Sequence, residues 1–308
     1  MYSRPTISRS GISDEARAWL TANPPENRAL ITIDNADAIR ADIRDGWAPA
    51  MAAARAEFDV TETPVEYGGI PCVEIFPADP HGTVFYCFGG GHTVGSPEED
   101  IVIEAPIALD ASARVVAVRY PLAPEHPFPA AVNATEAAYR ALLDEVGDGP
   151  LVVVGESAGG NLALALLQRV RAAGIRLPNA VALLSPWGDL AFSGDSHQID
   201  RDPTLVMGNG ELQVMADLYR GGAAVDDPLV SPIHADFSGF PPTLITTGTR
   251  DLLLSDCLRI ATGMEADGVE VTVRVWEGMW HVFEFYRELP EARASMQEVC
   301  TFIRDALR

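Results

Sequence analysis

Residues 151–161 read Leu-Val-Val-Val-Gly-Glu-Ser-Ala-Gly-Gly-Asn. The β-branched run before Gly155 predicts a buried strand, and residues 160–172 predict a helix that follows it at once. Between them stands a G-x-S-x-G motif, whose sharp strand-to-helix turn exposes the hydroxyl of Ser157. Gly155 and Gly159 suit such a turn because they have no side chain to clash. The turn also aims backbone N–H groups and a helix N-terminus at the carbonyl group that the serine would attack, which favours the negative charge that develops on the carbonyl oxygen.

A serine hydroxyl is a weak nucleophile, so a base and an acid that orients the base must follow in the chain. Asp251 comes just after the predicted strand 243–247, and His281 comes just after the predicted strand 270–276. The carboxyl ends of parallel strands lie at one edge of a sheet, so both side chains are expected beside Ser157. Asp256 is the alternative acid, but it falls about one turn into the following helix.

The remaining histidines do not have the position that a base needs. Three lie in polar, loop-like stretches and are expected to face solvent or to cap an element: His81, His197 and His234. His126 is expected to fix a turn. His92 follows three glycines and is expected to line a pocket.

Short apolar strands alternate with helices from residue 60 onward. A strand pair is expected at 60–67 and 72–76, and further strands at 83–88, 114–118, 151–155, 180–184, 243–247 and 270–276. Helices are expected near 99–110, 131–145, 160–172, 255–267 and 291–307. The alternation predicts an α/β fold, with a mostly parallel central sheet and helices on both faces.

Two segments fall outside this alternation. Residues 1–59 predict helices at 14–22, capped by Ser13, and at about 34–58, and they form an N-terminal helical cap segment. Residues 186–241 contain no good strand, and so long a stretch is unlike a bare loop. They are predicted to form a helical cap inserted into a catalytic domain of residues 60–308. The alternative is a surface excursion with no role.

These residues together resemble the bacterial hormone-sensitive-lipase family of esterases, over about residues 60–308. Residues 86–96 resemble the family's oxyanion loop, HGGG, and residues 119–131 resemble its YRLAPEHPFPAA segment. Residues 155–160 resemble GDSAGG, with glutamate in place of aspartate, and residues 185–190 match SPWxDL. The resemblance implies an α/β-hydrolase fold. It also implies a serine carboxylic-ester hydrolase of short- to medium-chain esters or lactones, which works through an acyl-enzyme without cofactor or metal.

Site residues follow from the resemblance position by position. It assigns Ser157 as the nucleophile, Asp251 as the acid and His281 as the base. The expected N–H donors of the oxyanion hole are Gly90, Gly91 and Ala158. Independently of the resemblance, the residues expected in the substrate pocket are His92, Trp187, Met207 and Trp280. The chain departs from the family at Phe88, where the family has the histidine of HGGG.

Two other functions use the same fold. A peptidase or amidase would need the same three residues, but such enzymes usually carry an additional large domain. A non-catalytic binding protein for small molecules would tolerate a defective triad, whereas this chain retains serine, acid and histidine. An ester or lactone is therefore the expected partner, and a homodimer is compatible with the family.

The amino-acid composition makes some classes of binding partner unfavourable. The 308 residues include 22 arginines and no lysine against 44 acidic residues, for a formal charge of −22. Such a surface repels nucleic acid and anionic membranes. The N-terminus has no apolar signal region and the apolar runs are too short to span a bilayer, so the expected location is the cytoplasm. The four cysteines lack metal-binding spacing and are expected as buried or partly buried thiols; a Cys72–Cys87 disulfide is the alternative.

Overall fold

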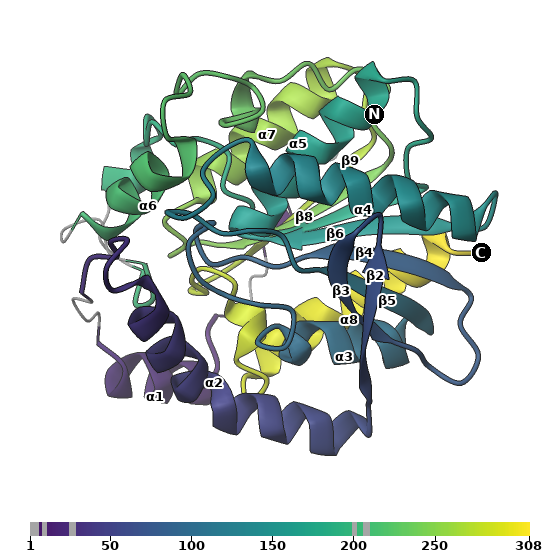
Figure 1. Cartoon of the computed structure of the whole chain (residues 1–308). Coiled ribbons are helices and arrows are strands. Elements are labelled where there is room, and N and C mark those ends of the chain that lie inside the picture. Colours follow the sequence, from purple (N-terminus) through teal and green to yellow (C-terminus); the bar gives the residue numbers. More distant parts are fainter. Residues whose placement is uncertain (1–5, 8–10, 25–28, 199–201, 206–209) are drawn as a thin grey trace.

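The computed structural model describes residues 6–7, 11–24, 29–198, 202–205 and 210–308 (Figure 1). Within these residues one sheet contains nine strands. They are β1 (Thr6–Ile7), β2 (Glu62–Tyr67), β3 (Ile70–Ile75), β4 (Gly82–Cys87), β5 (Ala113–Val118), β6 (Leu151–Glu156), β7 (Ala180–Leu184), β8 (Thr243–Gly248) and β9 (Val271–Trp276). Their order in the sheet is β1-β9-β8-β7-β6-β4-β5-β3-β2.

The sheet is parallel from β1 to β5 and antiparallel at β3 and β2. Strands β6 and β7 lie in its middle, and every residue of both is buried. Their continuous apolar sequence is typical of a strand that is covered on both faces. The antiparallel β2–β3 hairpin turns at Gly68 and Gly69, both at positive φ. The prediction of a mostly parallel sheet is confirmed.

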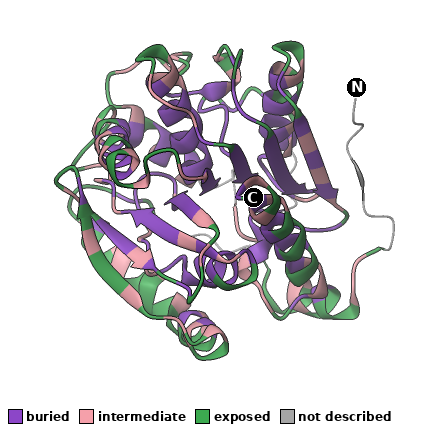
Figure 2. Ribbon diagram, turned by 90° about the vertical axis from the view of Figure 1, so that its right-hand side faces the viewer, coloured by how far each residue is buried: buried purple, intermediate pink, exposed green. Residues whose placement is uncertain are grey.

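Helices cover both faces, as predicted. They are α1 (Asp14–Ala22), α2 (Ala36–Phe58), α3 (Ile101–Asp110), α4 (Ala130–Val146), α5 (Ala158–Ala172), α6 (Glu211–Arg220), α7 (Leu254–Ala266) and α8 (Pro290–Ala306). Helices α4, α5 and α7 lie on one face and α3 and α8 on the other (Figure 1). The buried residues concentrate in the central strands, and exposed residues lie on the outer surfaces of the helices (Figure 2). No helix among the described residues is long and apolar enough to cross a membrane.

The inserted segment 186–241 is described in part, and its described residues contain one α-helix and two 3₁₀ turns. Its described residues form 3₁₀ turns at Asp195–Gln198 and Pro232–His234 and the α-helix α6; a third 3₁₀ turn, Phe283–Phe285, follows β9. Helix α6 lies near α1 and α2 at one side of the sheet (Figure 1). The division into a cap segment 1–59, a catalytic domain 60–308 and an inserted cap 186–241 stays a prediction.

Helix α1 is anchored to the C-terminal part of the chain. Ser13 caps it by accepting the N–H of Ala16 at 3.1 Å, and the Ser13 hydroxyl donates to Glu291 at 2.9 Å. Trp19 stacks on Trp280, with ring centroids 4.3 Å apart and planes at 17°. This contact belongs to a second apolar cluster, which is separate from the main core.

All four cysteines are buried free thiols. The prediction of buried or partly buried thiols is confirmed, and the alternative Cys72–Cys87 disulfide is wrong.

Candidate active site

Ser157 lies at the turn between β6 and α5. Its backbone has φ 52° and ψ −120°, a left-handed conformation that is costly for a residue with a side chain. The two glycines of the motif make this turn possible. A Cβ on Gly155 would overlap the carbonyl of Gly159, and a Cβ on Gly159 would overlap the carbonyls of Cys87 and Phe88. The neighbouring strand β4 therefore packs directly against the turn.

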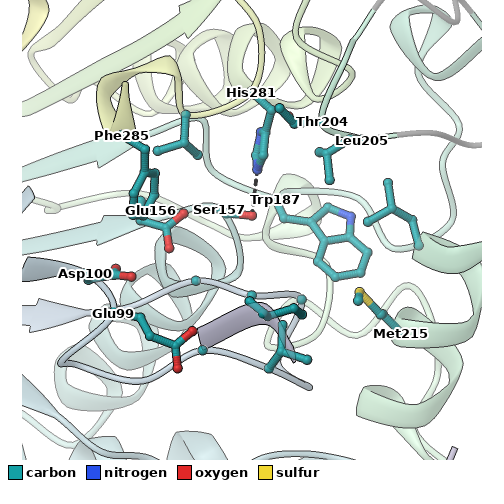
Figure 3. Close-up of a pocket in the computed structure, with 18 of the residues that line it drawn as sticks. Glu99, Asp100, Glu156, Ser157, Trp187, Thr204, Leu205, Met215, His281 and Phe285 are labelled. Atoms are coloured by element: carbon teal, nitrogen blue, oxygen red, sulfur yellow. Dashed lines mark hydrogen bonds between the residues drawn. The ribbon is translucent and has the colours of Figure 1, made fainter. Parts of the chain in front are cut away.

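His281 connects Ser157 to Asp251. Its Nε2 lies 2.8 Å from the Ser157 hydroxyl oxygen, a hydrogen bond that Figure 3 marks. Its Nδ1 lies 3.1 Å from Asp251 Oδ1. Asp251 is held in turn by the hydroxyl of Thr247 and the N–H of Leu253, each at 2.8 Å. The structure thus brings together the serine, histidine and aspartate that the sequence predicts.

The electrostatics of the pair favour a charged aspartate. Burial opposes ionisation of Asp251, but His281 and the hydrogen-bond donors outweigh it and hold the pKa of that carboxyl below its ordinary value. Burial also opposes a charge on His281, but Asp251, Asp202 and Glu284 outweigh it and raise the pKa of the imidazole. His281 can therefore hold a proton between these carboxylates when it acts as a base.

Asp256, the alternative acid, contacts His197 and not His281. Its Oδ2 accepts the N–H groups of Gly188 and Asp189, both at 3.0 Å, and its Oδ1 lies 3.1 Å from Nε2 of His197. His197 is 3% exposed, so the prediction that it faces solvent or caps an element is wrong. Asp256 compensates for the burial of His197. Burial alone would lower the pKa of the His197 imidazole, and the neighbouring carboxylate of Asp256 raises it. His81, His126 and His234 are exposed.

The predicted oxyanion-hole residues lie around the Ser157 hydroxyl. Gly90 and Gly91 line the pocket with φ of 93° and 59°, and Ala158 is the first residue of α5. Among the described residues, none accepts a hydrogen bond from the N–H groups of these three residues. A Cβ on Gly90 would overlap the carbonyl of Val94. Within the described part of the chain, the site therefore offers three N–H groups without an acceptor near the Ser157 hydroxyl.

The loop before these glycines is held by Tyr120. Phe88 is 1% exposed and its ring packs face to face with that of Tyr120. The Tyr120 hydroxyl lies within hydrogen-bond distance of the carbonyls of both Phe88 and Gly89. Phe88, which stands where the family has histidine, thus has a specific packing partner in the structure.

A pocket of about 180 Å³ lies over Ser157 and His281. Trp187 lines it, as predicted, beside Met215 of α6 and Leu205 (Figure 3). Its other lining residues include Ile43, Trp47, Val94, Leu212, Leu253, Val282, Phe285 and Tyr286. A wider cavity of about 790 Å³ adjoins it and shares several of these residues, including Ile43, Trp47, Phe285 and Tyr286.

Three carboxyl groups line the side of the pocket that lies across from Trp187 and Met215 (Figure 3). Sequence patterns do not predict them. They are Glu99, Asp100 and Glu156. Burial raises the pKa of Asp100 to about 7, and burial together with the charge of Asp100 raises the pKa of Glu156 well above its ordinary value. Tyr86 donates to Asp100 at 2.8 Å. The glutamate in the G-x-S-x-G motif was the one sequence signal for this group.

Two predicted pocket residues lie outside the pocket. His92 is 1% exposed and stacks on Tyr219, with ring centroids 3.6 Å apart, and burial lowers its pKa to about 3. Trp280 is fully buried against Trp19. Both side chains are used in packing, so these two predictions are wrong. Met207 lies outside the described residues. No group of three or more His, Cys, Asp or Glu side chains in the described part of the chain is arranged to hold a metal ion.

Residues 84–285 match the family model for the alpha/beta hydrolase fold. An acetyl-hydrolase of Streptomyces hygroscopicus is 38% identical over 226 residues, which is 73% of this chain and 76% of that protein. An esterase of Acinetobacter venetianus is 31% identical over 243 residues, 78% of this chain and 80% of its own. The crystal structure of a hormone-sensitive lipase from a metagenome library superposes with a TM-score of 0.86 at 33% identity, covering 97% of this chain and all of that one.

Proposed function

Because this chain belongs to the α/β-hydrolase family of esterases that includes the hormone-sensitive-lipase type, and is a carboxylic-ester hydrolase, we propose that it uses Ser157, His281 and Asp251 to form and hydrolyse an acyl-enzyme. The observation that carries the proposal is the continuous hydrogen-bonded line from the Ser157 hydroxyl through His281 to Asp251. Such a line supplies a nucleophile, a base and a group that orients the base.

In the first half of the reaction, the Ser157 oxygen attacks the ester carbonyl while Nε2 of His281 takes the hydroxyl proton. The negative charge that develops on the carbonyl oxygen is stabilised by the N–H groups of Gly90, Gly91 and Ala158. Asp251 keeps Nδ1 of His281 protonated and so presents Nε2 as the acceptor. The tetrahedral intermediate then collapses. Its carbon–oxygen bond to the alcohol breaks, and His281 returns the proton to the leaving alcohol.

In the second half, water attacks the acyl-enzyme. His281 takes a proton from the water, and the same N–H groups stabilise the second tetrahedral intermediate. Collapse releases the carboxylic acid and returns the proton to Ser157. No cofactor enters either half. A lactone follows the same steps, except that the freed hydroxyl stays joined to the acyl group through its carbon chain, and hydrolysis of the acyl-enzyme releases a single hydroxy acid.

The pocket supports short- to medium-chain acyl groups as substrates. Its volume of about 180 Å³ suits a small acyl group, and Trp187, Leu205 and Met215 supply apolar contacts for it. The adjoining cavity is much wider, at about 790 Å³, and leaves room for the alcohol part of the ester. The acetyl-hydrolase among the relatives agrees with a short acyl group.

The test compares the wild-type enzyme with Ser157→Ala on p-nitrophenyl esters from acetate to octanoate and on a panel of lactones. Loss of the nucleophile is expected to lower kcat by roughly 10⁶-fold, as in other serine hydrolases. Circular dichroism and the melting temperature should stay near wild type. A fluorophosphonate should label the wild-type protein once, and Ser157→Ala not at all. Undiminished turnover in Ser157→Ala would disprove the serine mechanism, and turnover of p-nitroanilides above that of esters would favour an amidase.

A further inference from the structure

Asp202 is a buried carboxylate that contacts both loops of the candidate active site. It comes from the inserted segment 186–241, and its side chain is 0% exposed. Its Oδ2 accepts the backbone N–H of His281 at 2.9 Å and the backbone N–H of Leu252 at 3.2 Å. Leu252 directly follows Asp251. One oxygen therefore bridges the loop of the histidine and the loop of the aspartate.

The other oxygen of Asp202 holds part of the pocket wall. Oδ1 accepts the N–H and the hydroxyl of Thr204, both at 2.8 Å, and the N–H of Leu205 at 3.1 Å. Thr204 and Leu205 both line the pocket, and Figure 3 shows them close to His281. A single side chain thus joins the pocket wall to the backbones of two catalytic loops.

The partners of Asp202 favour a carboxylate over any neutral side chain. All five contacts come from N–H or O–H donors, and an ionised carboxyl group can accept on both oxygens. Asparagine has nearly the same shape, but its NH₂ group would face N–H donors on one side or the other. These donors and His281 offset only part of the cost of burying the charge, since burial and the neighbouring Asp251 still raise the pKa of Asp202 above its ordinary value.

We propose that Asp202 is a positioning residue, which aligns His281 with Ser157 by fixing both catalytic loops and couples that alignment to the pocket wall at Thr204 and Leu205. This inference rests on the proposed roles of Ser157 and His281. Asp202 also acts on His281 through its charge. The carboxyl groups that raise the pKa of this imidazole are Asp251, Asp202 and Glu284.

The test is Asp202→Asn, assayed on p-nitrophenyl acetate across pH. Misalignment of the loops is expected to lower kcat by roughly 10- to 100-fold. Loss of a negative charge beside His281 is expected to move the acid limb of the kcat profile to lower pH, by up to about one unit. A purely structural role would lower the melting temperature without moving that limb.

Asp256→Asn is the matched control. Asp256 is also 0% exposed and accepts two backbone N–H groups, but none of its partners lines the pocket. This variant should lose stability and keep the kcat and pH profile of the wild type. A wild-type kcat and acid limb in Asp202→Asn would overturn the proposal. An inactive wild-type enzyme, or a fully active Ser157→Ala, would overturn the serine mechanism instead.

Thr204→Val supplies a second measurement if Asp202→Asn does not fold. It removes one donor from Asp202 and leaves the charge in place. The loss of one hydrogen bond is expected to lower kcat by about two- to tenfold, with an unchanged acid limb. A wild-type kcat in this variant, combined with an unfolded Asp202→Asn, would show that Asp202 is only structural.

Discussion

The Phe88 ring stacks on the Tyr120 ring at 4.1 Å and 13°, while the Tyr120 hydroxyl donates to the Phe88 carbonyl at 2.7 Å. The same two residues are thus joined by an aromatic contact and by a hydrogen bond to the main chain. The second contact is independent of the side chain at position 88. It explains how the glycine loop keeps its place although the family's histidine is absent.

Phe88→His is expected to destabilise the protein without a gain in rate. The imidazole would enter a site that is 1% exposed and built for a stacked phenyl ring, at a cost of about 1–3 kcal/mol in the free energy of unfolding. Urea unfolding and kcat on p-nitrophenyl acetate give the two values. Tyr120→Phe serves as the matched variant, since it retains the stack and removes the hydroxyl. A tenfold rise in kcat for Phe88→His at unchanged stability would contradict the packing role.

Asp251→Asn is expected to lower kcat by about 10⁴-fold, because His281 loses the partner that fixes its tautomer. Asp256→Asn has the same chemistry at a buried position that bonds to His197 and not to His281. It should therefore leave kcat near wild type. Steady-state kinetics of the two variants side by side decide the matter. The assignment of the acid would be wrong if Asp256→Asn proved the more damaging change.

Activity is expected to rise with pH through an apparent pKa above about 6.5, the ordinary value for histidine. His281 must be neutral to accept the Ser157 proton, and Asp251, Asp202 and Glu284 stabilise its protonated form. The acid limb is therefore displaced upward, not downward. A kcat profile between pH 4.5 and 9 on an ester with slow spontaneous hydrolysis measures it. An acid limb clearly below 6 would mean that burial outweighs the carboxylates.

Acyl-chain preference is expected to depend on Met215. Transition-state binding should improve by at most about 0.8 kcal/mol for each added CH₂ until the pocket is full, and then decline. Met215→Ala should move this limit to longer chains because it widens the pocket from α6, whereas Met215→Leu should not. Values of kcat/KM from acetate to octanoate test both statements. A flat response in all three proteins would show that the pocket does not bind the acyl chain.

Local sequence patterns are sufficient to predict most of the helices and strands of the fold. The helix at Asp14–Ala22 and the strand at Ala180–Leu184 have the predicted bounds, and the other predicted strands and helices of residues 60–308 differ from prediction by about two residues or fewer at each end, within the usual disagreement on where an element ends. The bounds of these elements can be predicted because apolar periodicity and capping residues lie within or next to each element in the sequence.

The same reasoning placed the three central side chains, since Asp251 and His281 each follow a strand of a parallel sheet. It could not place side chains whose environment depends on distant segments. His92 and Trp280 were expected in the pocket because of their neighbours in sequence. Their positions are instead set by rings from Tyr219 and Trp19, far away in the chain. The contacts of Asp202 could not be predicted from the sequence for the same reason, because its partners Leu252 and His281 come from other loops.

The stack of Trp19 on Trp280 gives α1 a thermodynamic link to catalysis. Trp280 is the residue before His281, so undocking of this nine-residue helix would remove the Trp19 contact from the histidine loop without breaking a strand of the sheet. Peripheral helices of this kind open at a lower free energy than a buried sheet. On heating, activity is therefore expected to be lost before the sheet unfolds, so that the temperature of half-inactivation would follow the stability of the N-terminal helix more than that of the whole fold.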